Sequence, residues 1–201
     1  MRLVIFFSMF LLISPGVLAE TEMLSRFGVS LYLPDNWRLL TLDELSAVDE
    51  ADSLDKESAG TQLKGREQLS KTMRTGGLEL IFNTEKVKNT SGFYDNITLI
   101  ETQDQVPEAV AQIKSTCAAL PGLLSRTLGR TVKLDTCEGR SVQGYPAFVL
   151  SYAGDTTDTR IIQYMLQLEQ NRSLVLTLTY HNKSLAAVKD FESAIERLKF
   201  N

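Results

Sequence analysis

The sequence predicts an α+β fold in which a central antiparallel sheet is flanked by helices. Three observations lead to this prediction. The last third of the chain contains three runs of alternating apolar residues, 145–152, 160–168 and 173–180, separated by turn-rich stretches, which is typical of an antiparallel meander. Apolar residues at helical spacing follow Pro107 and Ser184. Both faces of the meander strands carry apolar side chains, which indicates cover on both sides of the sheet.

The N-terminal residues are predicted to be a secretory signal peptide rather than part of the fold. Arg2 supplies a positive charge, residues 3–13 are apolar apart from one serine, and small residues ending at Ala19 favour cleavage after that position. The apolar run is shorter than the roughly 20 residues of a membrane-spanning helix, and an uncleaved anchor is the alternative. We therefore expect a signal peptide over 1–19 and a single domain over 20–201, because no repeat or clear linker divides the chain.

The first part of this domain is predicted to begin with a β-hairpin. Residues 26–33 alternate between apolar and polar, and a second short apolar run covers 37–40. Apolar residues then recur at helical spacing over 42–54, with many acidic residues between them up to position 57. The sign of the charge reverses over 64–74, where basic residues dominate. This charge reversal is either a binding surface or an ordinary solvated helix face.

The middle of the chain is predicted to contain two strands and a helix. The strands cover 78–82 and 96–100, and the polar segment 83–93 between them is predicted to be a surface loop. Pro107 suits the first turn of a helix, which Pro121-Gly122 is expected to interrupt.

The remaining elements lead into the meander and close the chain. A short second helical piece is expected at 123–128, a strand opens at 132–134, and the chain turns over 139–144. After the meander, Ser184 can cap a final helix. Its apolar face is expected to contain Val188, Phe191, Ile195 and Leu198.

The two cysteines, Cys117 and Cys137, are expected to form a disulfide in an exported protein. Cys117 falls in the predicted helix and Cys137 in the following strand, so the bridge would hold that helix to the sheet. Closing this loop would stabilise the fold by about 3 kcal/mol in the chain-entropy model. Two buried free thiols are the alternative, because spacing alone does not show that the side chains meet.

The composition argues against several classes of function. The chain has 21 Lys and Arg against 25 Asp and Glu, a net charge of −4, which lacks the basic footprint of a nucleic-acid-binding protein. One His and two Cys leave little material for a zinc site, an iron–sulfur cluster or a histidine-based triad. His181 follows a strand among polar residues, the ordinary place of a solvated side chain. No phosphate-binding, dinucleotide-binding or hydrolase motif occurs, so we predict no catalytic residue, metal or cofactor.

Several local patterns resemble the PsbP/Mog1-like superfamily, in its exported bacterial branch. Residues 27–37 (FGVSLYLPDNW) resemble the opening strand, proline and tryptophan of that family, and residues 93–99 (FYDNITL) resemble its strand that starts at Asp-Asn. The segments 144–147 (GYPA), 163–164 (QY) and 176–180 (LTLTY) resemble its C-terminal half. The resemblance implies an α/β/α sandwich around a central antiparallel sheet.

The same resemblance implies a protein that works by binding rather than by catalysis. Members of this superfamily assist assembly, stabilise complexes or bind partners. The photosynthetic branch works beside a manganese–calcium cluster, but this chain has no plastid transit region. The nuclear branch binds a small GTPase, which an exported protein would not meet.

Three hypotheses of function follow from the sequence. The first is a non-enzymatic periplasmic protein with a protein partner in the envelope, acting in envelope maintenance or complex assembly, with no nucleic-acid partner and no stable membrane insertion after cleavage. The second is a carrier of a small apolar ligand in a groove between sheet and helix, lined by residues such as Trp37 and Tyr164. The third is an enzyme with an unrecognised carboxylate site.

Overall fold

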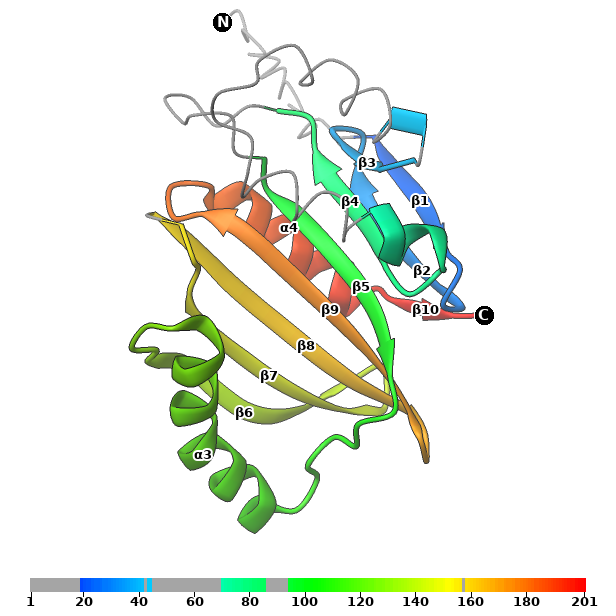
Figure 1. The fold of residues 1–201 in the computed structure, drawn as a ribbon. Coiled ribbons are helices and arrows are strands. Elements are labelled where there is room, and N and C mark those ends of the chain that lie inside the picture. Colours follow the sequence, from blue (N-terminus) through cyan, green and yellow to red (C-terminus); the bar gives the residue numbers. More distant parts are fainter. Residues whose placement is uncertain (1–18, 42, 45–69, 86–93, 157) are drawn as a thin grey trace, which may run out of the picture.

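The computed structural model describes residues 19–41, 43–44, 70–85, 94–156 and 158–201. Their strands form two antiparallel sheets, one of seven strands and one of three. Figure 1 shows the larger sheet running diagonally through the molecule, with the smaller sheet near the C-terminus.

The seven-stranded sheet is the centre of the fold, and every strand in it is antiparallel to its neighbours. Three of its strands are the predicted meander, which is confirmed as consecutive pairs. Across the sheet the order is β3 (Trp37–Leu39), β4 (Glu79–Asn83), β5 (Asn96–Thr102), β9 (Arg172–His181), β8 (Thr159–Glu169), β7 (Tyr145–Ala153) and β6 (Leu134–Val142).

The three-stranded sheet corrects the prediction of an N-terminal hairpin. Strand β2 (Val29–Pro34) pairs with β1 (Glu20–Ser25) on one side and with β10 (Lys199–Phe200) on the other. The turn after β2 instead carries the chain into the larger sheet, where β3 pairs with β4. The reason is the burial of Trp37, which is 1% exposed and places β3 against the core of the larger sheet. Strand β1 was missed because most of its residues are exposed and its sequence does not alternate.

Two long helices lie on opposite faces of the larger sheet, which confirms the α/β/α arrangement. Alternating residues of β8 show the two faces: Tyr164 packs in the cluster that includes α4 (Leu185–Glu196), and Met165 packs in the cluster beneath α3 (Val110–Leu128). Figure 1 shows α4 behind the sheet and α3 beside its β6 edge.

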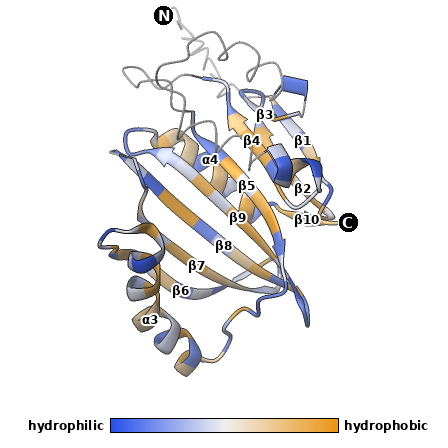
Figure 2. Cartoon of the chain, in the orientation of Figure 1, coloured by the Kyte–Doolittle hydropathy of each residue, from blue (hydrophilic) through white to orange (hydrophobic). Residues whose placement is uncertain are grey.

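The helices differ in how deeply they are buried. Helix α4 buries Ala187, Phe191, Ala194 and Ile195 in the larger core, and Leu198 is buried just beyond its end. Helix α3 contains no fully buried residue, although an apolar stripe along it packs partly against the sheet. Figure 2 shows hydrophobic residues concentrated along the central strands, with hydrophilic residues at the outer turns. The larger core therefore lies on the α4 side of the sheet.

Ser184 occupies the N-cap position of α4, as predicted, but its side chain does not cap the helix. Its hydroxyl donates instead to Oδ2 of Asp95, whose Oδ1 accepts a 2.8 Å hydrogen bond from the backbone N–H of His181. Asp95 is 1% exposed and precedes β5. This buried carboxylate thus joins the start of β5 to the corner between β9 and α4.

Three further local predictions need correction. Helix α3 continues past Pro121 as a single helix, and β6 extends through Gly139, so the turn before β7 is shorter than expected. His181 is 8% exposed rather than solvated, and its Nδ1 accepts a 3.2 Å hydrogen bond from the backbone N–H of Lys183. Packing explains all three differences. Contacts with neighbours distant in the sequence support the longer helix α3 and the longer strand β6, and they bury the side chain of His181.

Some predictions fall outside the described residues. These are the signal peptide over 1–19 apart from its last residue, most of the acidic segment 43–57, most of the basic segment 64–74 and most of the loop 83–93. The described residues 70–74 form a short helical segment. None of the helices in the described ranges is long and apolar enough to span a membrane.

Candidate functional site

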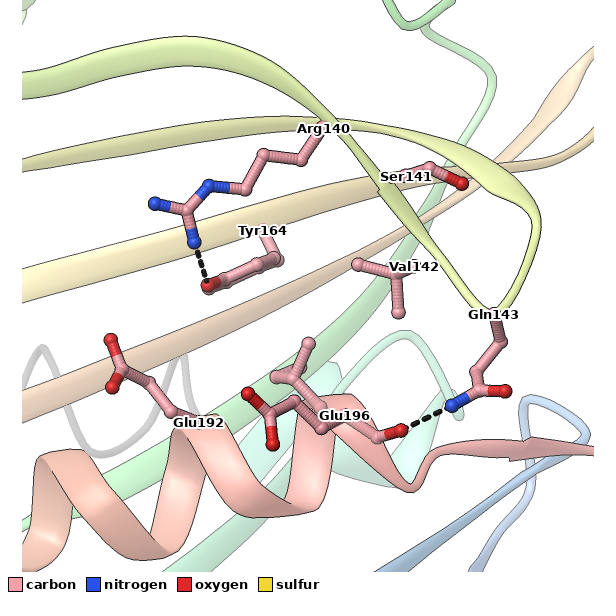
Figure 3. A pocket seen from close by; sticks show the side chains of 8 residues that line it. Arg140, Ser141, Val142, Gln143, Tyr164, Glu192 and Glu196 are labelled. Carbon is pink, nitrogen blue, oxygen red and sulfur yellow. Dashed lines mark hydrogen bonds between the residues drawn. The ribbon is translucent and has the colours of Figure 1, made fainter.

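The candidate functional site is a pocket between α4 and the part of the larger sheet formed by β6 and β8. It has a volume of about 390 Å³ and lies where the β6–β7 hairpin approaches the C-terminal half of α4. Figure 3 shows its side chains converging from β6, β8 and α4. The lining residues are Arg140, Ser141, Val142, Gln143, Tyr164, Glu192, Ile195 and Glu196.

Arg140 is held at one end of this pocket by two neighbours. Its Nε donates to Oε1 of Glu138 at 2.5 Å, its Nη2 forms an ion pair with the same oxygen at 2.5 Å, and its Nη1 donates to the hydroxyl of Tyr164 at 3.1 Å. The hydrogen bond to Glu138 raises the pKa of Arg140, and its charge is therefore compensated within the chain. Positions 138 and 140 lie on the same face of β6, which is why the strand brings these two side chains together.

Tyr164 forms the inner wall of the pocket. It is 4% exposed, and its ring packs edge-on against Phe191 of α4 with the ring centroids 5.8 Å apart. Burial raises the pKa of Tyr164, an effect that the charge of Arg140 opposes. The hydroxyl therefore stays protonated at neutral pH.

Gln143 closes the opposite end of the pocket. Gln143 and Gly144 both have positive φ, 52° and 85°, as in the tight two-residue turns that match the twist of a hairpin. This turn directs the amide of Gln143 toward α4, where its Nε2 donates to the backbone carbonyl of Glu196, as Figure 3 shows. The hairpin is therefore tied to the end of the helix.

Two carboxylates of α4 complete the lining. Glu192 and Glu196 are one helical turn apart and exposed, and in the described part of the chain neither side chain forms an ion pair or a hydrogen bond. Like charges at this spacing destabilise a helix by a few tenths of a kcal/mol. With Arg140 compensated by Glu138, the pocket has an excess of negative charge.

The pocket is lined by a mixed set of polar and charged groups. The pocket contains a cation, two carboxylates, the hydroxyls of Ser141 and Tyr164, and an amide, and its lining includes no thiol or imidazole. His181 lies elsewhere, at the β9–α4 corner. Over the described ranges, no three His, Cys, Asp or Glu side chains cluster as metal ligands would.

The structure separates the two residues that the sequence suggested for a groove. Tyr164 lines the pocket, but Trp37 does not. The Trp37 ring lies in the core, and its Nε1 donates a 2.9 Å hydrogen bond to Oδ2 of Asp190 on α4. Sequence reasoning missed Arg140, Glu192 and Glu196. The only available signal was the spacing of the two glutamates on the polar face of the last helix, which is common on solvated helices.

The disulfide expected between Cys117 and Cys137 is present in the structure. Their Cα atoms are 5.7 Å apart, and the bridge connects α3 with β6. It lies on the opposite side of the sheet from the pocket, in the apolar cluster beneath α3. The bridge is therefore separate from the pocket.

Comparison with known proteins shows the fold. No family model matches the sequence, and no curated protein matches it. Among solved structures, cyanobacterial PsbP from Synechocystis sp. PCC 6803 matches with a TM-score of 0.53 and 11% identity, covering 92% of this chain and 95% of that one. This likeness confirms the PsbP/Mog1-like fold that the sequence motifs suggested.

Two further structures match with lower TM-scores. The Ran-binding protein Mog1p of Saccharomyces cerevisiae has a TM-score of 0.49 and 8% identity, covering 91% of this chain and 96% of that one. LpqN of Mycobacterium tuberculosis, described as involved in cell envelope biogenesis, has a TM-score of 0.48 and 14% identity, covering 91% of each chain.

Proposed function

We propose that this chain of PsbP/Mog1-like fold is a non-enzymatic, exported protein that binds a protein partner in the bacterial envelope and acts in complex assembly or envelope maintenance. The single observation that carries the proposal is the charged pocket between α4 and the β6–β7 hairpin. The predicted signal peptide supports the location, and the predicted single domain over 20–201 supports a self-contained binding module.

The charges of the pocket favour a basic side chain as the group that the partner inserts. Among the described residues neither Glu192 nor Glu196 forms a contact ion pair, and each interacts with an arginine only at longer range: Glu192 with Arg140, and Glu196 with Arg197. Arg140 is itself engaged by Glu138 and Tyr164. A lysine or arginine placed between the two carboxylates would relieve their mutual repulsion. The volume of about 390 Å³ is within the usual range for a binding pocket.

Site-specific crosslinking tests the proposal directly. A photoreactive amino acid at Gln143, at the rim of the pocket, should capture a discrete envelope protein when the full chain is expressed with its own N-terminal segment. The same photoreactive amino acid at Gln170, an exposed glutamine in the β8–β9 turn that does not line this pocket, is the matched control. Capture from both positions alike, or from neither, would count against partner binding at this pocket.

The apolar-carrier hypothesis receives less support from the cavities. The lining of the pocket at Tyr164 is largely polar and charged. A second, more apolar cavity between β1, β2, β3 and β4 has a volume of only about 90 Å³, well below that of a typical ligand site. Native mass spectrometry after mild purification distinguishes the two hypotheses, because a carrier retains bound mass and a partner-binding protein does not.

The hypothesis of an enzyme with a carboxylate site has no geometric support in the pocket. Glu192 and Glu196 are exposed, and no activated nucleophile lies beside them in the pocket. A screen of hydrolase substrates at neutral pH tests this hypothesis. Turnover that is lost in the Glu192→Gln variant would overturn the proposal of a binding protein.

A further inference from the structure

Helix α3 is less deeply buried than α4, and a disulfide links it covalently to β6. None of its residues is fully buried, whereas α4 buries four. Pro121 lies inside α3 and has no N–H, so the carbonyl of Cys117, four residues earlier, lacks its helical hydrogen bond. The disulfide therefore attaches the helix at a point where its own backbone bonding is interrupted.

The helix covers an apolar strip on the β6–β8 side of the sheet. Beneath it are residues that are at most 8% exposed and form a cluster of their own, distinct from the larger core on the α4 side. The side chains that α3 contributes are only partly buried: Ile113, Cys117, Leu120, Leu124 and Leu128. The buried residues of the strip are Val106, Val132, Phe148, Leu150 and Tyr152.

The two clusters allow α3 to detach without loss of the rest of the fold. The larger core is formed by the α4 face, the smaller sheet and the central strands, and α3 contributes nothing to it. The strands beneath α3 remain paired with one another through β7. Removal of the helix would uncover the strip while the sheet and α4 persist.

We propose that α3 is a redox-released cover, which stays closed while the Cys117–Cys137 disulfide is intact and opens when it is reduced. Both cysteines are partly exposed, so a thiolate can reach them. The reductant is a dithiol, such as a thiol–disulfide oxidoreductase carries.

Reduction of the bridge by thiol–disulfide exchange needs no reactant other than the dithiol. One thiolate of the dithiol attacks a sulfur of the bridge, a mixed disulfide forms, and the other cysteine leaves as a thiolate. The second thiol of the donor then breaks the mixed disulfide. The donor ends as a disulfide, and Cys117 and Cys137 take up two electrons and two protons to become free thiols.

Hydrogen exchange of the purified full chain tests the proposal. The oxidised protein is compared with protein whose two cysteines have been reduced and alkylated, and with a Cys117→Ala/Cys137→Ala variant. Loss of the loop constraint is expected to raise the opening equilibrium of α3 by about a hundredfold. Amides of 110–128 should then exchange correspondingly faster, while those of α4 and β9 keep their protection.

A second measurement reports the uncovered strip. A dye that fluoresces on apolar surfaces should bind the reduced protein and the alanine variant, but not the oxidised protein. Treatment of the alanine variant with the reductant is the control and should change nothing. Unchanged exchange in α3 would overturn the proposal, and so would an absence of dye binding. Equal loss of protection in α4 would also overturn it, because the bridge would then support the whole fold.

Discussion

Replacement of Trp37 by Phe distinguishes a core residue from a groove-lining one. The indole is 1% exposed, and its Nε1 donates a 2.9 Å hydrogen bond to Oδ2 of Asp190 on α4. Phenylalanine keeps an aromatic ring in the core but removes the N–H donor and part of the ring volume. The variant therefore loses the only side-chain hydrogen bond that Trp37 makes and leaves a small void between β3 and α4.

The size of the effect follows from these two losses. A hydrogen bond to a charged group contributes about 1.5–3 kcal/mol, and the lower end applies because Asp190 is partly exposed. The smaller ring leaves about 40 Å³ unfilled, which costs about 1 kcal/mol at ~24 cal/mol per Å³. We expect Trp37→Phe to lower the free energy of unfolding by about 2–3 kcal/mol, a large part of the roughly 5–15 kcal/mol of a typical domain.

Urea unfolding followed by far-ultraviolet circular dichroism measures this loss, because the variant has no tryptophan left for fluorescence. A double-mutant cycle with Asp190→Ala should give a coupling of about 1 kcal/mol. Leu39→Ala, on the same strand but 38% exposed, is the control and should cost less than about 1 kcal/mol. A loss below 0.5 kcal/mol for Trp37→Phe, as an order-of-magnitude threshold for a surface residue, would refute its place in the core.

Four further outcomes are expected. Burial raises the pKa of Tyr164 above 10.0, so the folded state holds the phenol proton more tightly than the unfolded state. The contribution of this proton to the free energy of unfolding is complete below pH 10 and is lost as the pH rises through the folded-state pKa, so calorimetry should show a shallower alkaline decline of stability in Tyr164→Phe. A Cβ at Gly139 would lie 2.5 Å from Cδ1 of Ile113, a terminal methyl that can rotate away, so Gly139→Ala should cost no more than about 1 kcal/mol in denaturant unfolding, and adding Ile113→Val should recover part of it. Glu79 is 4% exposed and accepts from three donors, so Glu79→Gln should lower the unfolding free energy by about 2 kcal/mol, and a neutral result would contradict its role as a buried acceptor. Intact-mass analysis of the exported protein should show a chain that begins directly after Ala19, and a retained leader would contradict the predicted cleavage.

The meander was predictable because its signal is local. In β8 and β9, apolar residues alternate along each strand, and each strand pairs with its neighbour in sequence after a short turn. The final helix was predictable for a similar reason, since its apolar residues recur at helical spacing around Phe191. The disulfide was predicted from two cysteines and the expected export of the chain.

The errors occurred where distant contacts outweigh local signals. Strand β1 lacks alternation and is defined by its pairing with β2. Pro121 is a strong local signal for a helix end, yet α3 continues past it, packed on the sheet and bridged through Cys117. Trp37 looked available for a groove, and its burial is set by α4, which lies far away in the sequence.

The candidate pocket depended most on tertiary structure. Arg140, Gln143, Tyr164 and Glu192 come from a strand, a turn, another strand and a helix, and no short motif links them. The sequence alone determined the type of most of the main elements, because periodicity acts over a few residues, and it predicted export and a bridge between the two cysteines. Only the tertiary structure decided which sheet each N-terminal strand joins, how firmly each helix is held and which charges remain unpaired in a cavity, because burial and charge compensation depend on groups that folding brings together from distant positions.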